Sequence, residues 1–131
     1  MPVNIVNVTV INGITDGLLP SVATAVVLLP NPTATNVFKV DQIMVANVTS
    51  SAATATVQYY SNASVAKGSA PSGGSVVSTL AYQVSVPPNS TVIVSDKTTA
   101  FYVVDGNSVT VTSGTASALS YTISYELITA P

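Results

Sequence analysis

The residues of this sequence with the greatest capacity for chemistry are its carboxylates, because it contains no histidine and no cysteine. Ser-His and Cys-His nucleophile pairs are therefore absent, and so are imidazole and thiolate metal ligands. Two carboxylates that converge in space remain the one catalytic arrangement open to the chain, as in glycoside hydrolases. The candidates are Asp16, Asp41, Asp96, Asp105 and Glu126.

Three of these carboxylates stand in sequences typical of turns and loops. Asp16 and Asp105 each precede a glycine, and aspartate in such pairs commonly hydrogen-bonds to its own backbone. Asp96 precedes Lys97, which predicts a loop ion pair rather than an acid-base site. A structural role is therefore the interpretation for all three.

The other two acids fall in predicted strands. Asp41 lies two residues from Lys39 on the same strand face, which predicts an ion pair. Glu126 lies on the polar face of the last predicted strand, where a charge discourages edge pairing. The sequence has no Asp-x-Asp-x-Asp-Gly calcium loop. We expect no enzymatic activity, no cofactor and no bound metal.

The scarcity of charge limits the partners of the chain. Its 131 residues suffice for one domain with a sizeable core, yet only 6% are charged, against about 25% in ordinary domains. The three lysines, without any arginine, are too few to bind a phosphate backbone. Such a surface suits a protein packed among neighbours, and we expect no nucleic-acid partner.

The sequence also argues against a membrane-spanning helix and an export signal. Its longest aliphatic runs, such as residues 25–29, are about five residues long, whereas a spanning helix needs about 20. Residues 1–4 lack the basic start and apolar core of a signal peptide. We therefore expect a product made in a cytoplasm, with no membrane partner.

The elements that must position any site are β-strands. In the clearest case, residues 119–127, bulky apolar side chains alternate with Ser, Thr and Glu, a period of two. Similar patterns, separated by turn residues, predict eight or nine strands and no helix. The predicted strands are residues 3–11, 21–29, 37–47, 54–60, 80–86, 91–95, 100–104, 108–112 and 119–127.

Turn chemistry organises the connections between these strands. Residues 12–13 and 16–17 are Asn-Gly and Asp-Gly turn signals, and residues 49–51 form a short link that predicts a hairpin between 37–47 and 54–60. Residues 61–75 form the one long loop. The economical architecture for residues 1–131 is a single antiparallel β-sandwich, jelly-roll or Ig-like, with an N-terminal arm at 1–11.

Several short motifs add a family resemblance over about residues 37–128. They read KVDQIMVAN at 39–47, VPPNSTV at 86–92, SDK at 95–97, FYV at 101–103, DGN at 105–107 and ISYEL at 123–127. In these motifs the chain resembles the small β-rich virion proteins of tailed bacteriophages. It departs from their pattern at Asp105-Gly106, where Gly-Asp is usual, and at Glu126-Leu127, where two acids are usual.

The resemblance implies a structural role in a virion, most plausibly as a capsid decoration or cement protein. Its partner would then be the major capsid protein of the phage head, and we expect a homo-oligomer, a dimer or a trimer. The alternatives are a tail or baseplate component and a carbohydrate- or receptor-binding module.

The residues that we expect to contact a partner are aromatic side chains and prolines. Tyr60, Phe101 and Tyr102 are the candidates to present aromatic surface to a protein or glycan, and packing in the core is the alternative role for most of the tyrosines. The loop 61–75 and the turn that contains Pro30 and Pro32 are candidates for contact with the capsid shell, since both offer uncharged backbone.

Overall fold

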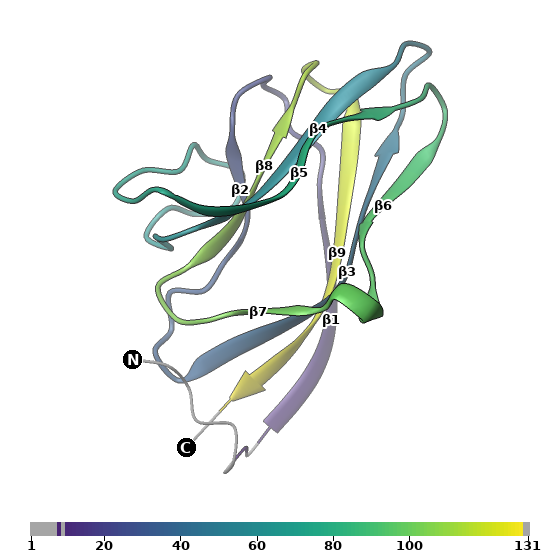
Figure 1. The fold of residues 1–131 in the computed structure, drawn as a ribbon. Coiled ribbons are helices and arrows are strands. Elements are labelled where there is room, and N and C mark those ends of the chain that lie inside the picture. The colour runs from purple at the N-terminus through teal and green to yellow at the C-terminus, as the bar shows by residue number, and fades with distance from the viewer. Residues whose placement is uncertain (1–7, 9, 130–131) are drawn as a thin grey trace.

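The computed structural model describes residue 8 and residues 10–129, which form an all-β domain of two antiparallel sheets (Figure 1). The predicted antiparallel β-sandwich is confirmed. No helix in this part of the chain is long and apolar enough to cross a membrane. The elements are β1 (Val10–Leu18), β2 (Val26–Pro30), β3 (Asn36–Asn47), β4 (Ala53–Tyr60), β5 (Val76–Val86), β6 (Thr91–Ser95), the 3-10 helix η2 (Lys97–Thr99), β7 (Phe101–Val103), β8 (Ser108–Ser113) and β9 (Leu119–Thr129).

The two sheets pack face to face around the hydrophobic core. Sheet A has the order β1-β9-β3-β6, with β7 also paired to β3, and sheet B has the order β2-β8-β4-β5. Alternate residues of the central strands point between the sheets, as a period of two requires. Fully buried examples are Val40, Ile43 and Val45 in β3, Tyr121 and Ile123 in β9, Val57 in β4 and Val109 in β8.

The first strand differs from the prediction. β1 pairs with β9 along its whole length, so the Asn12-Gly13 and Asp16-Gly17 signals lie inside a strand and not in turns. Gly17 lies so close to β9 that a Cβ there would be 3.3 Å from the Tyr121 carbonyl oxygen. Pairing with β9 therefore outweighs local turn preference. Of the predicted strand and arm at 1–11, residues 1–7 and 9 lie outside the described residues.

The predicted hairpin between the third and fourth strands is wrong. β3 lies in sheet A, whereas β4 lies in sheet B and pairs with β5 and β8. The connection between them crosses from one sheet to the other, and Asn47 holds it there by donating to the carbonyls of Ser51 and Val86. A short link with turn residues fits both a hairpin and a crossing, so the sequence did not distinguish them.

The strand predicted at 80–86 exists but lies at an edge. β5 is longer than predicted, and Leu80, Tyr82 and Val84 are exposed, while Val86 is buried. The alternation of apolar residues predicted that one face of this strand packs on the core. At the edge of the sheet, most of that face is exposed. The strand predicted at 21–29 begins only at Val26, where the buried run starts.

The long loop at 61–75 has no strand, as predicted, but it is tied to sheet B rather than free. The Val27 N–H donates to the Ser69 carbonyl, and the Gly68 N–H donates to the Val27 carbonyl, so the loop covers the edge of β2 (Figure 1). The Tyr60 hydroxyl donates to the Gly74 carbonyl at 2.9 Å. The loop therefore shields part of sheet B.

Candidate binding surface

A bulge in β3 places two consecutive polar side chains on the outer face of sheet A. The pairing with β9 shifts between Val40 and Gln42, so that both Val40 and Ile43 reach the core although they are three residues apart. Asp41 and Gln42 are left on the outside, beside Ser124 of β9. Bulges commonly re-aim side chains in this way at functional sites.

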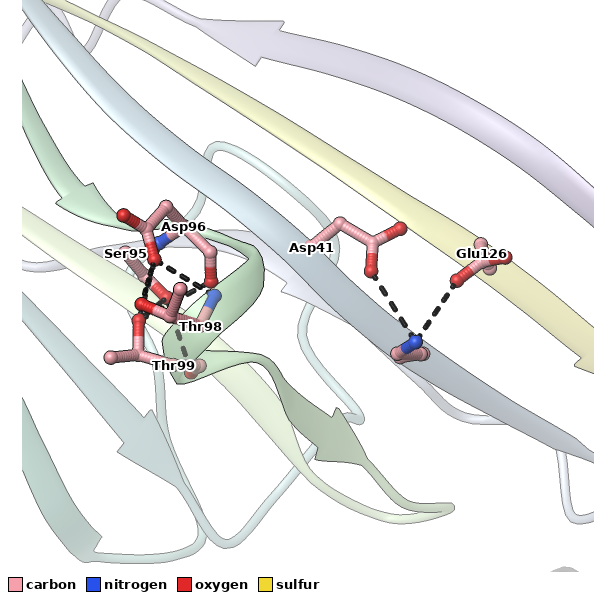
Figure 2. A network of polar contacts seen from close by, with 7 residues as sticks. Asp41, Ser95, Asp96, Thr98, Thr99 and Glu126 are labelled. Atoms are coloured by element: carbon pink, nitrogen blue, oxygen red, sulfur yellow. Dashed lines mark hydrogen bonds and ion pairs between the residues drawn. The ribbon is translucent and has the colours of Figure 1, made fainter.

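The 3-10 helix η2 forms the wall of this surface (Figure 2). Asp96 caps the helix, because its carboxylate accepts from the Thr98 N–H at 2.9 Å and from the Thr98 hydroxyl at 2.5 Å. These bonds favour the charged form and hold the pKa of Asp96 below its ordinary value. The Thr99 hydroxyl closes the cap by accepting from the Asp96 N–H. Asp96 thus bonds within η2 and does not form the predicted pair with Lys97.

Lys39 connects the bulge to the neighbouring strand β9. Its Nζ lies 3.8 Å from a carboxylate oxygen of Asp41 and 3.7 Å from one of Glu126, one on each side of the ammonium (Figure 2). The predicted ion pair between Lys39 and Asp41 is therefore confirmed, and it extends into a small network. In the register of the sheet, Tyr102 of β7 lies opposite Lys39, which lies opposite Glu126.

The β3 bulge and η2 border an open depression of about 470 Å³. Asp41, Gln42 and Ser124 line one side of it, and Asp96, Lys97 and Thr98 line the other. A general acid needs a pKa raised toward the working pH, whereas that of Asp96 is lowered. Among residues 8 and 10–129 no three metal-binding side chains come together. The arrangement suits hydrogen bonding to a polar partner.

The charges of the protein are unevenly distributed over its surface. Three of the eight charged residues, Asp41, Asp96 and Lys97, line this depression. Lys39 pairs with Asp41, and Glu126 pairs with Lys39. We call the surface that carries these five residues the charged face. In contrast, none of the residues in the four strands of sheet B, all of them described, is charged. A sixth and seventh charge, Asp16 and Lys67, pair with each other at 2.6 Å.

The predicted contact residues lie in different environments. Tyr102 is 47% exposed beside the charged face, and Pro32 is exposed in the turn after β2. Phe101 and Pro30 are half-buried. Tyr60 is buried, so its ring is not available to a partner. The structure thus brings only Tyr102 to the charged face.

Sequence reasoning did not find Gln42, Ser124 or η2. The signal for the bulge was present, because Val40 and Ile43 lie three positions apart in a strand whose apolar residues should recur at every second position. Asp96 with Thr98 and Thr99 after it forms a helix-capping sequence, which marks the start of η2. Both are local patterns that hydrophobic alternation alone does not reveal.

No protein-family model, no curated protein and no solved structure matches this chain.

Proposed function

We propose that this chain is a non-enzymatic structural protein of a phage virion, a decoration protein that attaches to the head surface through the charged face. The observation that supports this role is the segregation of charge. Five of eight charges gather on the charged face, which β3, β9 and the η2 segment form, whereas the strands of sheet B have none. The identification of the partner as a phage head is supported by the short sequence motifs alone.

The chemistry of the charged face suits attachment rather than catalysis. Its acids are held by Lys39 and by the η2 cap, so the face presents fixed charges and hydrogen-bonding groups at defined positions. Fixed complementary charges give a contact its orientation and specificity more than its raw affinity. The exposed ring of Tyr102 adds apolar area at the margin of the face.

The test is to mix the purified protein with undecorated, expanded heads of the phage that encodes it and to image the particles by electron microscopy. Regular extra density on the head lattice is the expected result. Bare heads, with the protein on tails or free in solution, would overturn the proposal.

Two lysine variants then test whether the charged face makes the contact. Lys39→Gln removes the cation that lies between two carboxylates of the face, and we expect head binding to fall at least about tenfold. Lys67→Gln removes a lysine outside the charged face and serves as the matched control. Circular dichroism of both variants checks that they fold. Equal binding by both variants would exclude the charged face as the attachment surface.

A carbohydrate-binding module is the second candidate, and the depression favours it. Carboxylate, amide and hydroxyl groups line the depression, and groups of this kind fix a polar ligand in a binding site. Tyr102, which lies opposite Lys39 in the sheet, is an exposed aromatic side chain beside the charged face. A glycan array tests this role. Binding should be lost in Tyr102→Ala but retained in Tyr82→Ala, which removes another exposed tyrosine. A wild-type protein without glycan binding would rule this candidate out.

A further inference from the structure

β5 is an edge strand of sheet B with several exposed apolar side chains. β5 has eleven residues and pairs, within the described structure, with β4 alone. Its exposed apolar side chains include Tyr82, which at 68% has the largest exposed fraction of the large hydrophobic residues. The set consists of Val76, Val77, Leu80, Tyr82 and Val84.

The pairing of β5 with β4 shifts register at three places, and one of these bulges lies at the exposed Tyr82. Ala81 pairs with Val57 and Val84 with Ala55, so two residues, Tyr82 and Gln83, stand opposite one residue of β4. The backbone of Gln83 has a φ of 48°, in the left-handed region, and its N–H donates to a threonine hydroxyl of β4. This conformation is uncommon for a residue other than glycine and is typical of bulges that re-aim a side chain.

The other sheet edges carry protection that β5 lacks. The loop covers the β2 edge through its bonds to Val27, and β2 ends in Pro30. β6 and β7 have only five and three residues. β1 carries Asp16, paired with Lys67. Short strands, prolines, covers, charges and bulges are the usual devices that prevent edge pairing. β5 is long and contains neither charge nor proline, and of these devices it has only the bulges in its pairing with β4.

We propose that β5 pairs in the antiparallel sense with β5 of a second copy of this chain, across a two-fold axis. An uncharged, apolar edge accepts a strand that is itself uncharged and apolar, because a charge buried against it would lack a partner. A second β5 meets this requirement. Two-fold symmetry makes one surface complementary to itself, and the pairing would join two four-stranded sheets into one of eight strands.

The area of this contact predicts a weak dimer for the isolated protein. Eleven residues at about 3.3 Å each give an edge of about 36 Å, and a strip about 10 Å wide buries about 360 Å² per copy. A stable interface needs about 800 Å² per partner. The dimer should therefore form only at high protein concentration, and anchoring copies on a common surface would strengthen it.

Single-cysteine variants test the pairing directly, because the chain contains no cysteine of its own. In an antiparallel pair, opposite Cα atoms lie about 4.5–5.5 Å apart, within the range of a disulfide. We expect at least one of Ser78→Cys, Leu80→Cys and Tyr82→Cys to form a disulfide-linked dimer under mild oxidation. Val22→Cys, at an exposed position outside the edge, should not.

Sedimentation equilibrium over a range of protein concentrations provides the second measurement. The wild type should shift toward dimer as concentration rises. A lysine at whichever of residues 78, 80 and 82 forms the crosslink should keep the chain monomeric, because two lysines would then meet across the axis. Mixing that variant with the glutamate variant at the same position should restore association, while Val22→Lys should behave as the wild type. The measurement uses the isolated protein without heads, so a negative result is distinguishable from failure of head attachment.

Two results would overturn the proposal. One is a monomer at every concentration together with no crosslink at any of the three β5 positions, which would leave the edge to a strand of another protein. The other is a dimer that persists when lysine replaces the crosslinking residue, which would place the contact elsewhere on the chain.

Discussion

Asn47, at the end of β3, provides the sharpest test of how the two sheets are joined. Its Nδ2 donates to the carbonyls of Ser51 at 2.8 Å and Val86 at 3.0 Å, and its Oδ1 accepts from the N–H and the hydroxyl of Thr49 at 2.9 Å and 2.7 Å. The residue is only 3% exposed. One side chain thus ties β3, the crossing connection and the end of β5 together.

Replacing Asn47 with alanine removes all four hydrogen bonds. The Val86 carbonyl is then buried without this donor, which costs about 1–3 kcal/mol, and each of the other three bonds contributes about 0.5–1 kcal/mol where water partly replaces it. We expect Asn47→Ala to lower the free energy of unfolding by about 2.5–6 kcal/mol. That is a large part of the roughly 5–15 kcal/mol typical of a domain.

Asn47→Asp adds a pH dependence to the same test. The new carboxylate would face two carbonyl oxygens in a buried position, which raises its pKa above the unfolded value of about 3.9. The folded state then binds more protons than the unfolded state, so stability falls as pH rises through this range. The deficit relative to the wild type should therefore be larger at neutral pH than in mild acid.

Urea unfolding followed by far-ultraviolet circular dichroism measures both variants, since the chain has no tryptophan. Asn12→Ala, at an exposed position of β1, is the control and should change stability by less than about 0.5 kcal/mol. A loss below about 1 kcal/mol in Asn47→Ala would refute the reasoning, as would a deficit of Asn47→Asp that grows on acidification.

Three further variants test the core, the loop attachment and the loop backbone. Ile123→Ala should lower the free energy of unfolding by about 2–5 kcal/mol in urea titrations, because it leaves a cavity in the fully buried center of β9. Lys67→Met should cost up to about 1 kcal/mol, since the pair with Asp16 is partly exposed. The hydrogen bond from Lys67 is the main cause of the lowered pKa of Asp16. The ion pair therefore stabilises the fold above the ordinary aspartate pKa, and this stabilisation is lost as pH falls through the lowered pKa of Asp16. The stabilities of the wild type and Lys67→Met should therefore converge in acid. Gly73→Ala should cost roughly 1–2 kcal/mol and lower the melting temperature, because Gly73 has a φ of 74° and a Cβ there would strike Asn62.

Matched variants separate these effects from general sensitivity to mutation. Ile93→Ala shortens an exposed isoleucine of β6, and Gly13→Ala adds a Cβ where no atom lies within 4 Å, so each should stay within about 0.5 kcal/mol of the wild type. If Ile93→Ala cost as much as Ile123→Ala, the assigned core would be wrong. If Gly73→Ala and Gly13→Ala behaved alike, the strained backbone of the loop would not contribute to stability.

Hydrophobic alternation identified strands well but not their neighbours. The pattern at 119–127 predicted β9, and the one at 91–95 matches β6, because each strand has one face on the core. The same period of two at Leu80, Tyr82 and Val84 belongs to an exposed edge. Alternation shows that a strand has an apolar face, but the sheet order decides what covers that face. Sheet order depends on long-range pairing, which the local pattern does not contain.

Local turn chemistry was reliable where no strand competed for the backbone. Asp105-Gly106 forms a turn, and Gly106 has the positive φ of 84° that favours glycine. Asn12-Gly13 and Asp16-Gly17 have similar sequences, but β9 offers that segment a full ladder of partners. The hydrogen bonds between β1 and β9 satisfy the backbone N–H and C=O groups of this segment, so it forms a strand and not a turn.

The charged face could be predicted in part. The Lys39–Asp41 pair follows from two residues on one strand, but the approach of Glu126 requires β3 and β9 to be neighbours. The wall at η2 requires the connection after β6 to return beside the β3 bulge. Residues far apart in the sequence meet here through sheet order, which explains why Gln42 and Ser124 were missed.

The attachment of the 61–75 loop changes how its role must be tested. The sequence suggested a flexible contact segment, and replacing it with a Gly-Ser linker would be the direct test of that role. In the structure the loop bonds to Val27, accepts from the Tyr60 hydroxyl and carries Lys67 to Asp16. A linker would uncover the edge of β2 and create a second unprotected strand in a sheet without charges. Any loss of head binding would then follow from aggregation or unfolding as readily as from a missing contact, so single exposed positions of the loop, such as Ser64, provide the sharper test.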